Sequence, residues 1–252
     1  MQRQELTSLL SGLYEPQKFR DYAPNGLQVE GKQDIVKIVT GVTASEALID
    51  RAIAEKADAI IVHHGYFWKG ESEVITGMKY RRIAKLIRND INLYGYHLPM
   101  DAHPQLGNNV QLALALGLEG LAPLESGKEL DESIGVVGSL PGSVATMDFI
   151  EKVATVVDRQ VLAEVVIPTV QRVALCTGGA QGYIHKAIAI GADLFITGEV
   201  SEQTIHVARE ESISFCAAGH HATECFGPRA LAEYLNRLEG IDALFVDVPN
   251  PA

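Results

Sequence analysis

The sequence has few cysteines and no long apolar run. Its three cysteines form no C-x-x-C pair, which argues against a disulfide framework or a cysteine-ligated zinc site and suits a reducing compartment. No segment approaches the roughly 18–20 consecutive apolar residues of a membrane span. The first residues also lack the basic and apolar regions of a signal peptide. We therefore expect a cytoplasmic protein without a membrane segment.

Positive charge is scarce as well. The 252 residues include 21 Lys and Arg against 32 Asp and Glu, which gives a formal net charge of −11. A protein that binds duplex nucleic acid needs a basic face to displace counterions, so nucleic acid is the weakest of the candidate partners. The composition, 47% apolar and 21% charged, is that of a globular chain long enough for one large domain or two small ones.

Short apolar runs alternate with amphipathic segments along the whole chain. After a first helix near residues 4–13 and a turn-rich stretch at 21–28, the alternation predicts an α/β fold with mixed, largely parallel sheets. Strands are expected at 35–42, 59–62, 91–96, 134–140, 161–167, 173–177, 193–197, 213–217 and 243–248. One long helix is expected at 222–238, before the last strand.

The two halves of the chain resemble each other. A shift of 135 residues places Ala52-Ile53-Ala54 on Ala187-Ile188-Ala189 without a gap. We predict two similar, intertwined α/β halves, 1–124 and 125–252, with a metal site between them. The alternative is that two strand–helix–strand units share composition by chance. A second shift, of 123 residues, places His97 and Asp101 on His220 and Glu224.

Histidines gather where strands are expected to end. The pairs His63-His64 and His220-His221, and also His97, each follow an apolar run, and Asp101 and Glu224 lie four residues after a histidine. The carboxyl ends of parallel strands form one edge of a sheet, where ligands bind. Imidazoles with carboxylates suit Zn²⁺, Fe²⁺, Mn²⁺, Ni²⁺ or Co²⁺ rather than Mg²⁺. Two such ions can activate a water molecule for attack on carbon or phosphorus.

Each of these features also has a simpler interpretation. A single histidine pair is more often a hydrogen-bonded structural feature than a ligand set, and only the three clusters together favour a metal site. Phe67-Trp68, just after the first pair, either stacks on a planar substrate or fills the core. Thr197-Gly198-Glu199 is either a turn or a source of a carboxylate that supports a ligand.

The combined motifs resemble a known family. V-H-H-G at 62–65, H-x-x-x-D at 97–101 and G-H-x-x-x-E at 219–224 are similar to the dinuclear-metal GTP cyclohydrolase type 2 homologues, the Nif3-like family. The resemblance covers essentially the whole chain and is closest to the short bacterial members, the YbgI proteins. It includes N-G-L-Q at 25–28 and V-P-N-P at 248–251.

The resemblance implies a site and an activity. It implies two divalent transition-metal ions per subunit, with Glu224 bridging them, and a homohexameric ring. His97 would act as a proton shuttle near the metals, and His221 is a second candidate acid or base. The implied function is metal-dependent hydrolysis of a nucleotide or a related small molecule. The alternative is a non-enzymatic ring protein that binds metal, or has a regulatory or metal-delivery role. The implied metal ligands are His63, His64, Asp101, His220 and Glu224.

Overall fold

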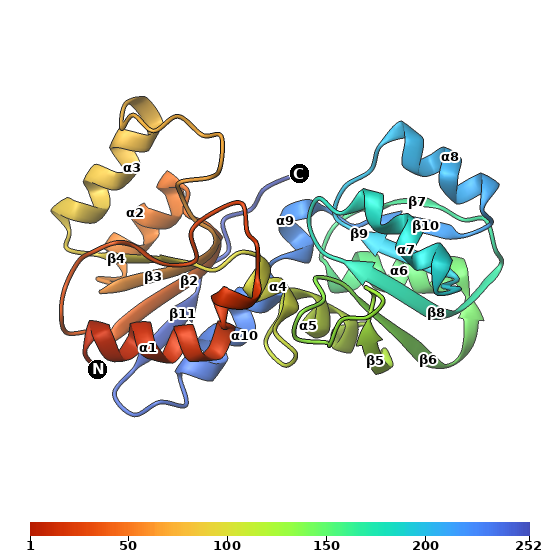
Figure 1. Cartoon of the computed structure of the whole chain (residues 1–252), viewed down its shortest axis with the longest axis horizontal. Helices are drawn as coiled ribbons and strands as arrows, with labels where there is room; N and C mark the ends of the chain where they lie inside the picture. The colour runs from red at the N-terminus through yellow and green to blue at the C-terminus, as the bar shows by residue number, and fades with distance from the viewer. The chain divides into compact units, whose positions relative to one another are not determined.

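The computed structural model describes all 252 residues and shows a mixed α/β fold with two sheets (Figure 1). The chain forms two compact units: unit 1 contains residues 1–100 and 227–248, and unit 2 contains 101–226 and 249–252. This division differs from the expected halves, because residues 101–124 fold with unit 2 and residues 227–248 return to unit 1. The return is made by a C-terminal strand that pairs with the sheet of unit 1.

The sheet of unit 1 has five strands. Four adjacent strands run parallel to one another, and the fifth, at one edge of the sheet, is antiparallel to its neighbour. Their spatial order is β1 (Gly26–Val29), β4 (Asn92–Gly95), β3 (Ala59–His64), β2 (Lys37–Thr43) and β11 (Asp242–Phe245). Buried parallel strands are apolar on both faces, which is why the apolar runs were visible in the sequence.

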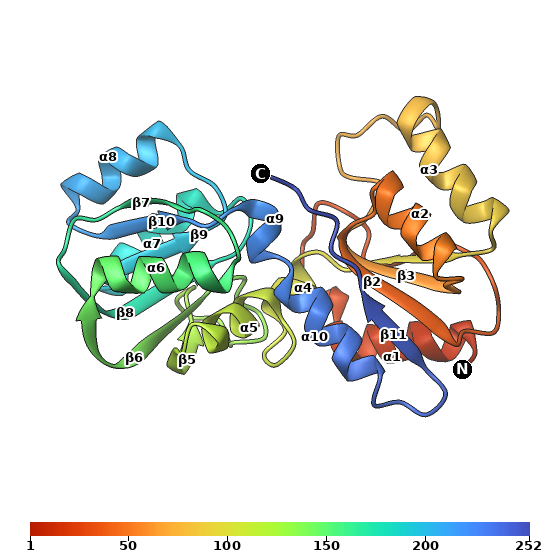
Figure 2. The ribbon, with the colours of Figure 1, turned by 180° about the vertical axis from the view of Figure 1, so that it is seen from behind.

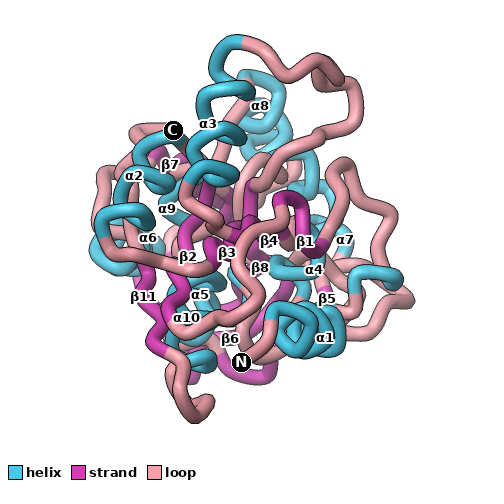
Figure 3. Tube along the Cα trace, turned by 90° about the vertical axis from the view of Figure 1, so that its left-hand side faces the viewer, coloured by secondary structure: helices cyan, strands magenta, loops and turns pink.

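Helices cover both faces of this sheet (Figure 3). Successive residues of a strand point to opposite faces, so Ile60 faces one layer and Ile61 the other. Ile61 packs with α1 (Arg3–Tyr14) and α10 (Phe226–Leu235). Ile60 packs with α2 (Glu46–Ala54) and α3 (Gly77–Arg88). Both faces of the sheet are therefore covered by apolar side chains of the helices.

The sheet of unit 2 has six strands. Three central strands are parallel, and the other three pair antiparallel with their neighbours. Their order is β5 (Glu119–Pro123), β6 (Val136–Ala145), β8 (Thr169–Cys176), β9 (Leu194–Thr197), β10 (Ser214–Ala217) and β7 (Leu162–Glu164).

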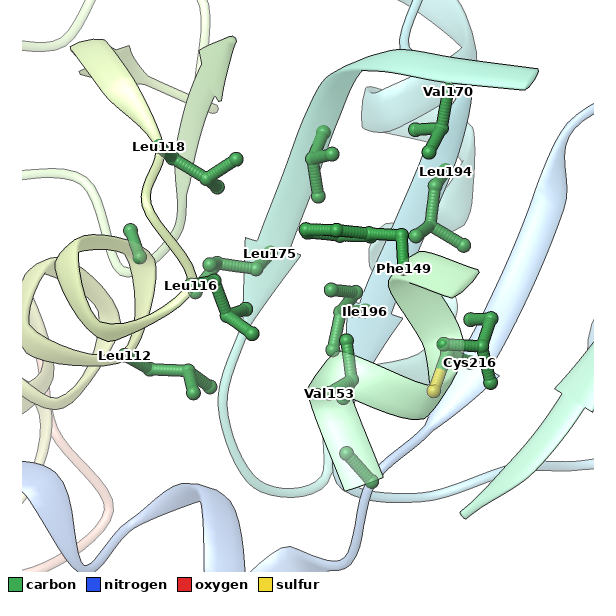
Figure 4. Close-up of a cluster of buried hydrophobic side chains, with 14 of the residues drawn as sticks. Leu112, Leu116, Leu118, Phe149, Val153, Val170, Leu175, Leu194, Ile196 and Cys216 are labelled. Carbon is green, nitrogen blue, oxygen red and sulfur yellow. The ribbon is translucent and has the colours of Figure 1, made fainter. Parts of the chain in front are cut away.

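Two layers of helices also cover this second sheet. Helices α5 (Asn108–Ala115) and α6 (Thr146–Val156) pack on one face, and Figure 2 shows α6 in front of the strands. In Figure 4 the side chain of Phe149, from α6, lies beside Leu175, Leu194 and Ile196 of the strands. Helices α7 (Ile184–Ala189) and α8 (Glu202–Glu210) cover the other face.

The two sheets share a four-strand arrangement. The order β1-β4-β3-β2 in unit 1 matches β7-β10-β9-β8 in unit 2, with the antiparallel strand at the same edge. Ile38 pairs with Ala59 in unit 1, and Val173 pairs with Leu194 in unit 2. Each residue of the second pair lies 135 positions after its counterpart in the first pair. This common register supports the predicted internal repeat.

The same register corrects the second predicted overlay. Ala59 pairs with Asn92, and Leu194 pairs with Ser214, so these strands correspond with a shift of 122 residues rather than 123. His97 therefore corresponds to Gly219, the residue before His220. Gly219 has a φ of 94°, a conformation that glycine adopts at little cost.

The repeat extends to a half-buried carboxylate at the start of the paired strands. Oδ2 of Asp58 accepts hydrogen bonds from the backbone N–H groups of Val36 and Lys37, at 3.0 Å each. Asp193 does the same for Gln171 and Arg172. Burial would raise the pKa of Asp58, but hydrogen bonds from Lys32 and the two amides outweigh it, so its pKa lies below its ordinary value.

We expect Asp58→Asn to lower the free energy of unfolding by about 1–3 kcal/mol at pH 7, since it weakens these hydrogen bonds. A carboxyl whose pKa is lowered by folding stabilises the protein above its unfolded pKa of about 3.9 and loses that contribution as the pH falls. The difference from wild type should therefore shrink below about pH 4. Urea unfolding at a series of pH values measures it, and a difference independent of pH would contradict this account.

Some elements differ from the prediction. The single helix expected at 222–238 is divided into α9 (His220–Thr223) and α10, and the break falls at Glu224 and Cys225. Strands β1 and β5 and the short helix α4 (Leu98–Ala102) were not expected. The two strands lie at sheet edges, where the alternating apolar pattern is weak. None of the helices combines the length and apolar character needed to cross a membrane.

Candidate metal centre

Three histidines meet at one edge of the sheet of unit 1. His63 and His64 are the last two residues of β3, and His97 follows the adjacent strand β4. One ring nitrogen of each lies within 4.8 Å of those of the other two. The ring centroid of His63 lies 4.4 Å from that of His64 and 5.0 Å from that of His97. This spacing is close enough for the three side chains to hold a metal ion.

In each of these imidazoles Nδ1 contacts a protein oxygen. Nδ1 of His63 lies 3.3 Å from the carbonyl oxygen of Tyr96, and Nδ1 of His64 lies 3.2 Å from Oγ1 of Thr43. Nδ1 of His97 lies 2.6 Å from Oδ1 of Asp21. Carbonyl and carboxylate oxygens only accept hydrogen bonds, so His63 and His97 carry a proton on Nδ1. In a neutral ring this leaves the Nε2 lone pair for a metal ion or a proton.

Asp21 is a buried carboxylate that sequence analysis did not single out. Its side chain is 4% exposed. Oδ1 accepts from His97 Nδ1 and the Tyr22 amide, and Oδ2 accepts from Asn25 Nδ2 and the Leu98 amide. Burial would raise the pKa of Asp21, but the hydrogen bond and charge of His97, with the other donors, lower it to about 2.

Aromatic side chains surround His97. The Trp68 ring meets the His97 ring edge-on with centroids 4.8 Å apart, and it lies 5.7 Å from His64. Tyr22 lies 6.4 Å from His97 and is 63% exposed. Phe67 has a φ of 66°, which is rare for a bulky residue, and is 37% exposed. Phe67 is exposed and Trp68 is half-buried, so neither ring fills the core, and the contact of Trp68 with His97 favours the substrate-facing interpretation.

A second polar cluster lies in unit 2. Nδ1 of His220 is 2.7 Å from Oε1 of Glu199, and Nε2 is 3.2 Å from Oε1 of Glu224. The hydrogen bond with Glu224 raises the pKa of His220 to about 9; burial opposes this increase and Glu199 adds to it. The two carboxylates around His220 therefore form an environment that stabilises positive charge at this position.

Asp101 is fixed within the same unit by neutral donors. Its Oδ1 accepts from Asn108 Nδ2 at 2.9 Å and from Thr177 Oγ1 at 3.2 Å, and the residue is 7% exposed. Thr177 and Gly178 form the turn after β8. A Cβ on Gly178 would overlap Oε1 of Glu224 and lie 3.2 Å from Nε2 of His220. The turn therefore contacts Asp101 on one side and Glu224 on the other.

The predicted site residues are divided between the two units of the fold. His63, His64 and His97 lie in unit 1, and the division between the units falls at Asp101 within α4. Unit 2 contains Asp101, His220, His221 and Glu224. His221 has its Nε2 3.6 Å from Sγ of Cys225. Both predicted pairs have a carboxylate four residues after a histidine. His220 and Glu224 are in contact, whereas His97 and Asp101 belong to different units.

Several polar residues of the site were not predicted. Asp21 is 76 residues from His97, and Asn108 and Thr177 have no local pattern that marks them as partners of Asp101. Glu199 was considered as a supporting carboxylate, because it follows strand β9, and its contact with His220 matches that interpretation. Long-range contacts of this kind leave no periodic signal in a sequence.

The donor set fits divalent transition-metal ions. Histidine ligands of metals usually donate their second N–H to a carboxylate or a carbonyl, which fixes the tautomer and the orientation of the ring. This arrangement occurs in three pairs: His63 with Tyr96, His97 with Asp21, and His220 with Glu199.

The family of this chain is shown by comparison with known proteins. A family model described as Duf34/NIF3 (NGG1p interacting factor 3) matches residues 1–251.

The chain belongs to the DUF34/NIF3 family. It is 54% identical over 254 residues to a Haemophilus influenzae protein named GTP cyclohydrolase 1 type 2 homolog, with full coverage of both chains. The corresponding Escherichia coli protein of the same name is 52% identical, also with full coverage.

Solved structures agree with this membership. One described as protein ybgI, of unknown function, has 52% identity and a TM-score of 0.94 with full coverage of both chains. Protein TTHA1606 from Thermus thermophilus has 36% identity and a TM-score of 0.91, again with full coverage. The DUF34/NIF3 fold is therefore common to this chain and to these proteins.

Proposed function

We propose that this protein is a metal-dependent hydrolase with a dinuclear centre, acting on a nucleotide or a related small molecule. The proposed ligands are His63, His64, Asp101, His220 and Glu224. Imidazoles with carboxylates suit Zn, Fe, Mn, Ni or Co ions. The relatives named as GTP cyclohydrolase homologues supply the reaction class.

One observation carries the proposal: the histidines have Nδ1 held by protein oxygens. His63, His64 and His97 in unit 1 and His220 in unit 2 each have such a contact, at 2.6–3.3 Å. A histidine that only packs or caps needs no fixed tautomer, whereas a metal ligand or proton-transfer group does. The partners of His63, His97 and His220 are oxygens that only accept, so they place a proton on Nδ1, whereas the hydroxyl of Thr43 beside His64 can donate or accept. Three histidines with a fixed Nδ1 proton support a chemical role over a purely structural one.

The remaining residues have distinct proposed roles. Divalent ions held by the ligands would polarise the electrophilic centre of the substrate and the attacking water. His97, with its Nε2 directed away from Asp21, accepts or returns a proton during the reaction. His221 is the second candidate for that role. Both are proposed as catalytic residues.

The aromatic side chains near His97 support a planar substrate. Trp68 and Tyr22 offer ring surfaces beside His97, and Tyr22 is 63% exposed. Stacking on aromatic side chains is a common way to bind a planar heterocycle. This arrangement agrees with the nucleotide class that the names of the relatives suggest.

We further propose a homohexameric ring in the cytoplasm, on the basis of the family resemblance. No disulfide joins any of the three cysteines, which suits a reducing compartment. Sedimentation should give a mass of six times the 27.3 kDa chain.

Metal analysis of protein purified without chelator tests the proposed function most directly. We expect two divalent ions per chain, and turnover in a screen of nucleotides, modified nucleotides and phosphoesters. Activity should disappear after chelation and return when a divalent ion is added. Metal binding without turnover by any of these compounds would favour the alternative, a ring that binds or delivers metal without catalysis. Absence of bound metal would contradict both.

A further inference from the structure

The segment from Asp21 to Gln28 runs beside the strand ends that carry the histidines of unit 1. Asn25 Oδ1 accepts from the His97 amide at 2.8 Å, and Gln28 Oε1 accepts from the Tyr66 amide at 2.7 Å. The Gln28 side-chain amide also lies where a Cβ on Gly65 or Gly95 would be, with Nε2 2.6 and 2.8 Å from those positions. This segment thus contacts the residues that follow both β3 and β4.

Asp21 has the most specific position in this segment. Its two oxygens accept four hydrogen bonds, and all four donors are fixed: two backbone amides, the Asn25 side chain and His97 Nδ1. Asn25 Nδ2 and the Leu98 amide hold Oδ2, so the carboxylate cannot rotate without losing them. Oδ1 is therefore presented to His97 in one orientation.

We propose that Asp21 is a positioning residue that holds His97 as the Nδ1-protonated tautomer, with Nε2 directed toward His63 and His64. The inference rests on the proposed function for its catalytic consequence, but the tautomer itself is independent of turnover. A carboxylate can only accept, so Nδ1 must carry the proton. In the neutral ring Nε2 is then the atom that can take up a proton or bind a cation beside the other two histidines.

A merely structural role for Asp21 predicts something different. If Asp21 only ties residues 21–25 to His97 and Leu98, then its loss lowers stability and leaves the tautomer of His97 to the surroundings. If it positions His97, then the identity of the atom at Oδ1 determines where the imidazole proton lies. The Asp21→Asn variant separates these two roles, because its amide is the same size but has a donor in place of one acceptor.

The amide of the Asp21→Asn variant must orient its NH₂ group toward one of two sets of partners. If NH₂ faces Asn25 and the Leu98 amide, it meets two donors and loses both hydrogen bonds. If it faces His97 instead, it loses only the hydrogen bond from the Tyr22 amide, donates to Nδ1 and moves the imidazole proton to Nε2. We expect the second orientation, since it costs fewer hydrogen bonds.

Nitrogen-15 NMR of histidine-labelled protein, at a pH where neutral imidazole predominates, measures the outcome. The His97 signals are assigned by their absence in His97→Gln. In wild type, treated with chelator, we expect Nδ1 protonated and Nε2 unprotonated. In Asp21→Asn we expect the Nε2-protonated form to become the major one. In the metal-loaded protein we expect turnover to fall about 10–100-fold, the usual cost of removing a carboxylate that orients a histidine at a metal site.

Asp58→Asn is the matched control. Asp58 is a carboxylate of the same unit with a side chain 13% exposed, and it also accepts two backbone hydrogen bonds, but no histidine contacts it. It should lower stability and leave the His97 signals as in wild type. An unchanged tautomer in Asp21→Asn, or Nε2-protonated His97 in wild type, would overturn the inference. A tautomer change without turnover in wild type would support the inference and count against the proposed function.

Discussion

The Glu224→Gln variant is expected to lose most of its bound metal while keeping its fold. Glu224 is 3% exposed, and its Oε1 lies 3.2 Å from Nε2 of His220, so the carboxylate and the imidazole converge on one point. A glutamine keeps the size of the side chain but removes the negative charge that a divalent cation requires. The metal affinity should fall by more than about 100-fold, the upper end of what removing an outer partner of a ligand costs. Metal analysis and competition with a chelating dye measure it.

Glu202→Gln is the matched control for this substitution. Glu202 lies in the first turn of α8 in the same unit and its side chain is 93% exposed. The Glu202→Gln substitution removes the same charge from the chain as Glu224→Gln. A difference in metal content between the two variants therefore reports the local role of Glu224 and not the net charge. Equal metal content in Glu224→Gln and wild type would exclude Glu224 as a ligand.

The Gly178→Ala variant is expected to be both less stable and poorer in metal. Gly178 has a φ of 69°, which costs a residue with a Cβ about 1–2 kcal/mol. Its new methyl group would also overlap Oε1 of Glu224, and overpacking of this kind costs about 1–3 kcal/mol. The turn cannot easily move away, because the Gly178 amide donates to Thr223 Oγ1 and its carbonyl accepts from the Gly198 amide.

We therefore expect the free energy of unfolding of Gly178→Ala to fall by about 2–5 kcal/mol in urea, and the metal affinity to fall at least tenfold, because Glu224 and His220 are displaced together. Gly182→Ala is the control: a Cβ there meets nothing within 4 Å, and its φ is not positive. That variant should unfold within about 0.5 kcal/mol of wild type. Normal stability and metal content in Gly178→Ala would show that the turn does not restrain Glu224.

The predicted and observed elements agree best where a strand is buried on both faces. The runs near Ala59 and Leu194 are apolar over their whole length, and both are central strands of their sheets. The agreement is poorer at 222–238, where the apolar spacing of a helix continues through Glu224 although the backbone breaks there. Periodicity records which residues are buried, and a carboxylate buried by polar partners interrupts the helix without interrupting the pattern.

The sequence by itself determined the alternation of strands and helices, the family and the presence of histidines at the carboxyl ends of β3, β4 and β10. Each of these follows from local spacing or from motifs of a few residues. Only the tertiary structure decided the division of the chain into units, since this depends on β11 returning to β2 from the far end of the sequence. It also decided the partners of the histidines.

The contacts of Asp21 with His97 and of Glu199 with His220 illustrate that difference. They join residues 76 and 21 positions apart. Hydrogen bonds of this kind depend on where two loops meet in space, and a linear pattern of residue types does not encode that meeting. The sequence therefore identified the groups able to bind metal or transfer protons, and the fold determined which nitrogen of each imidazole remains available to do so.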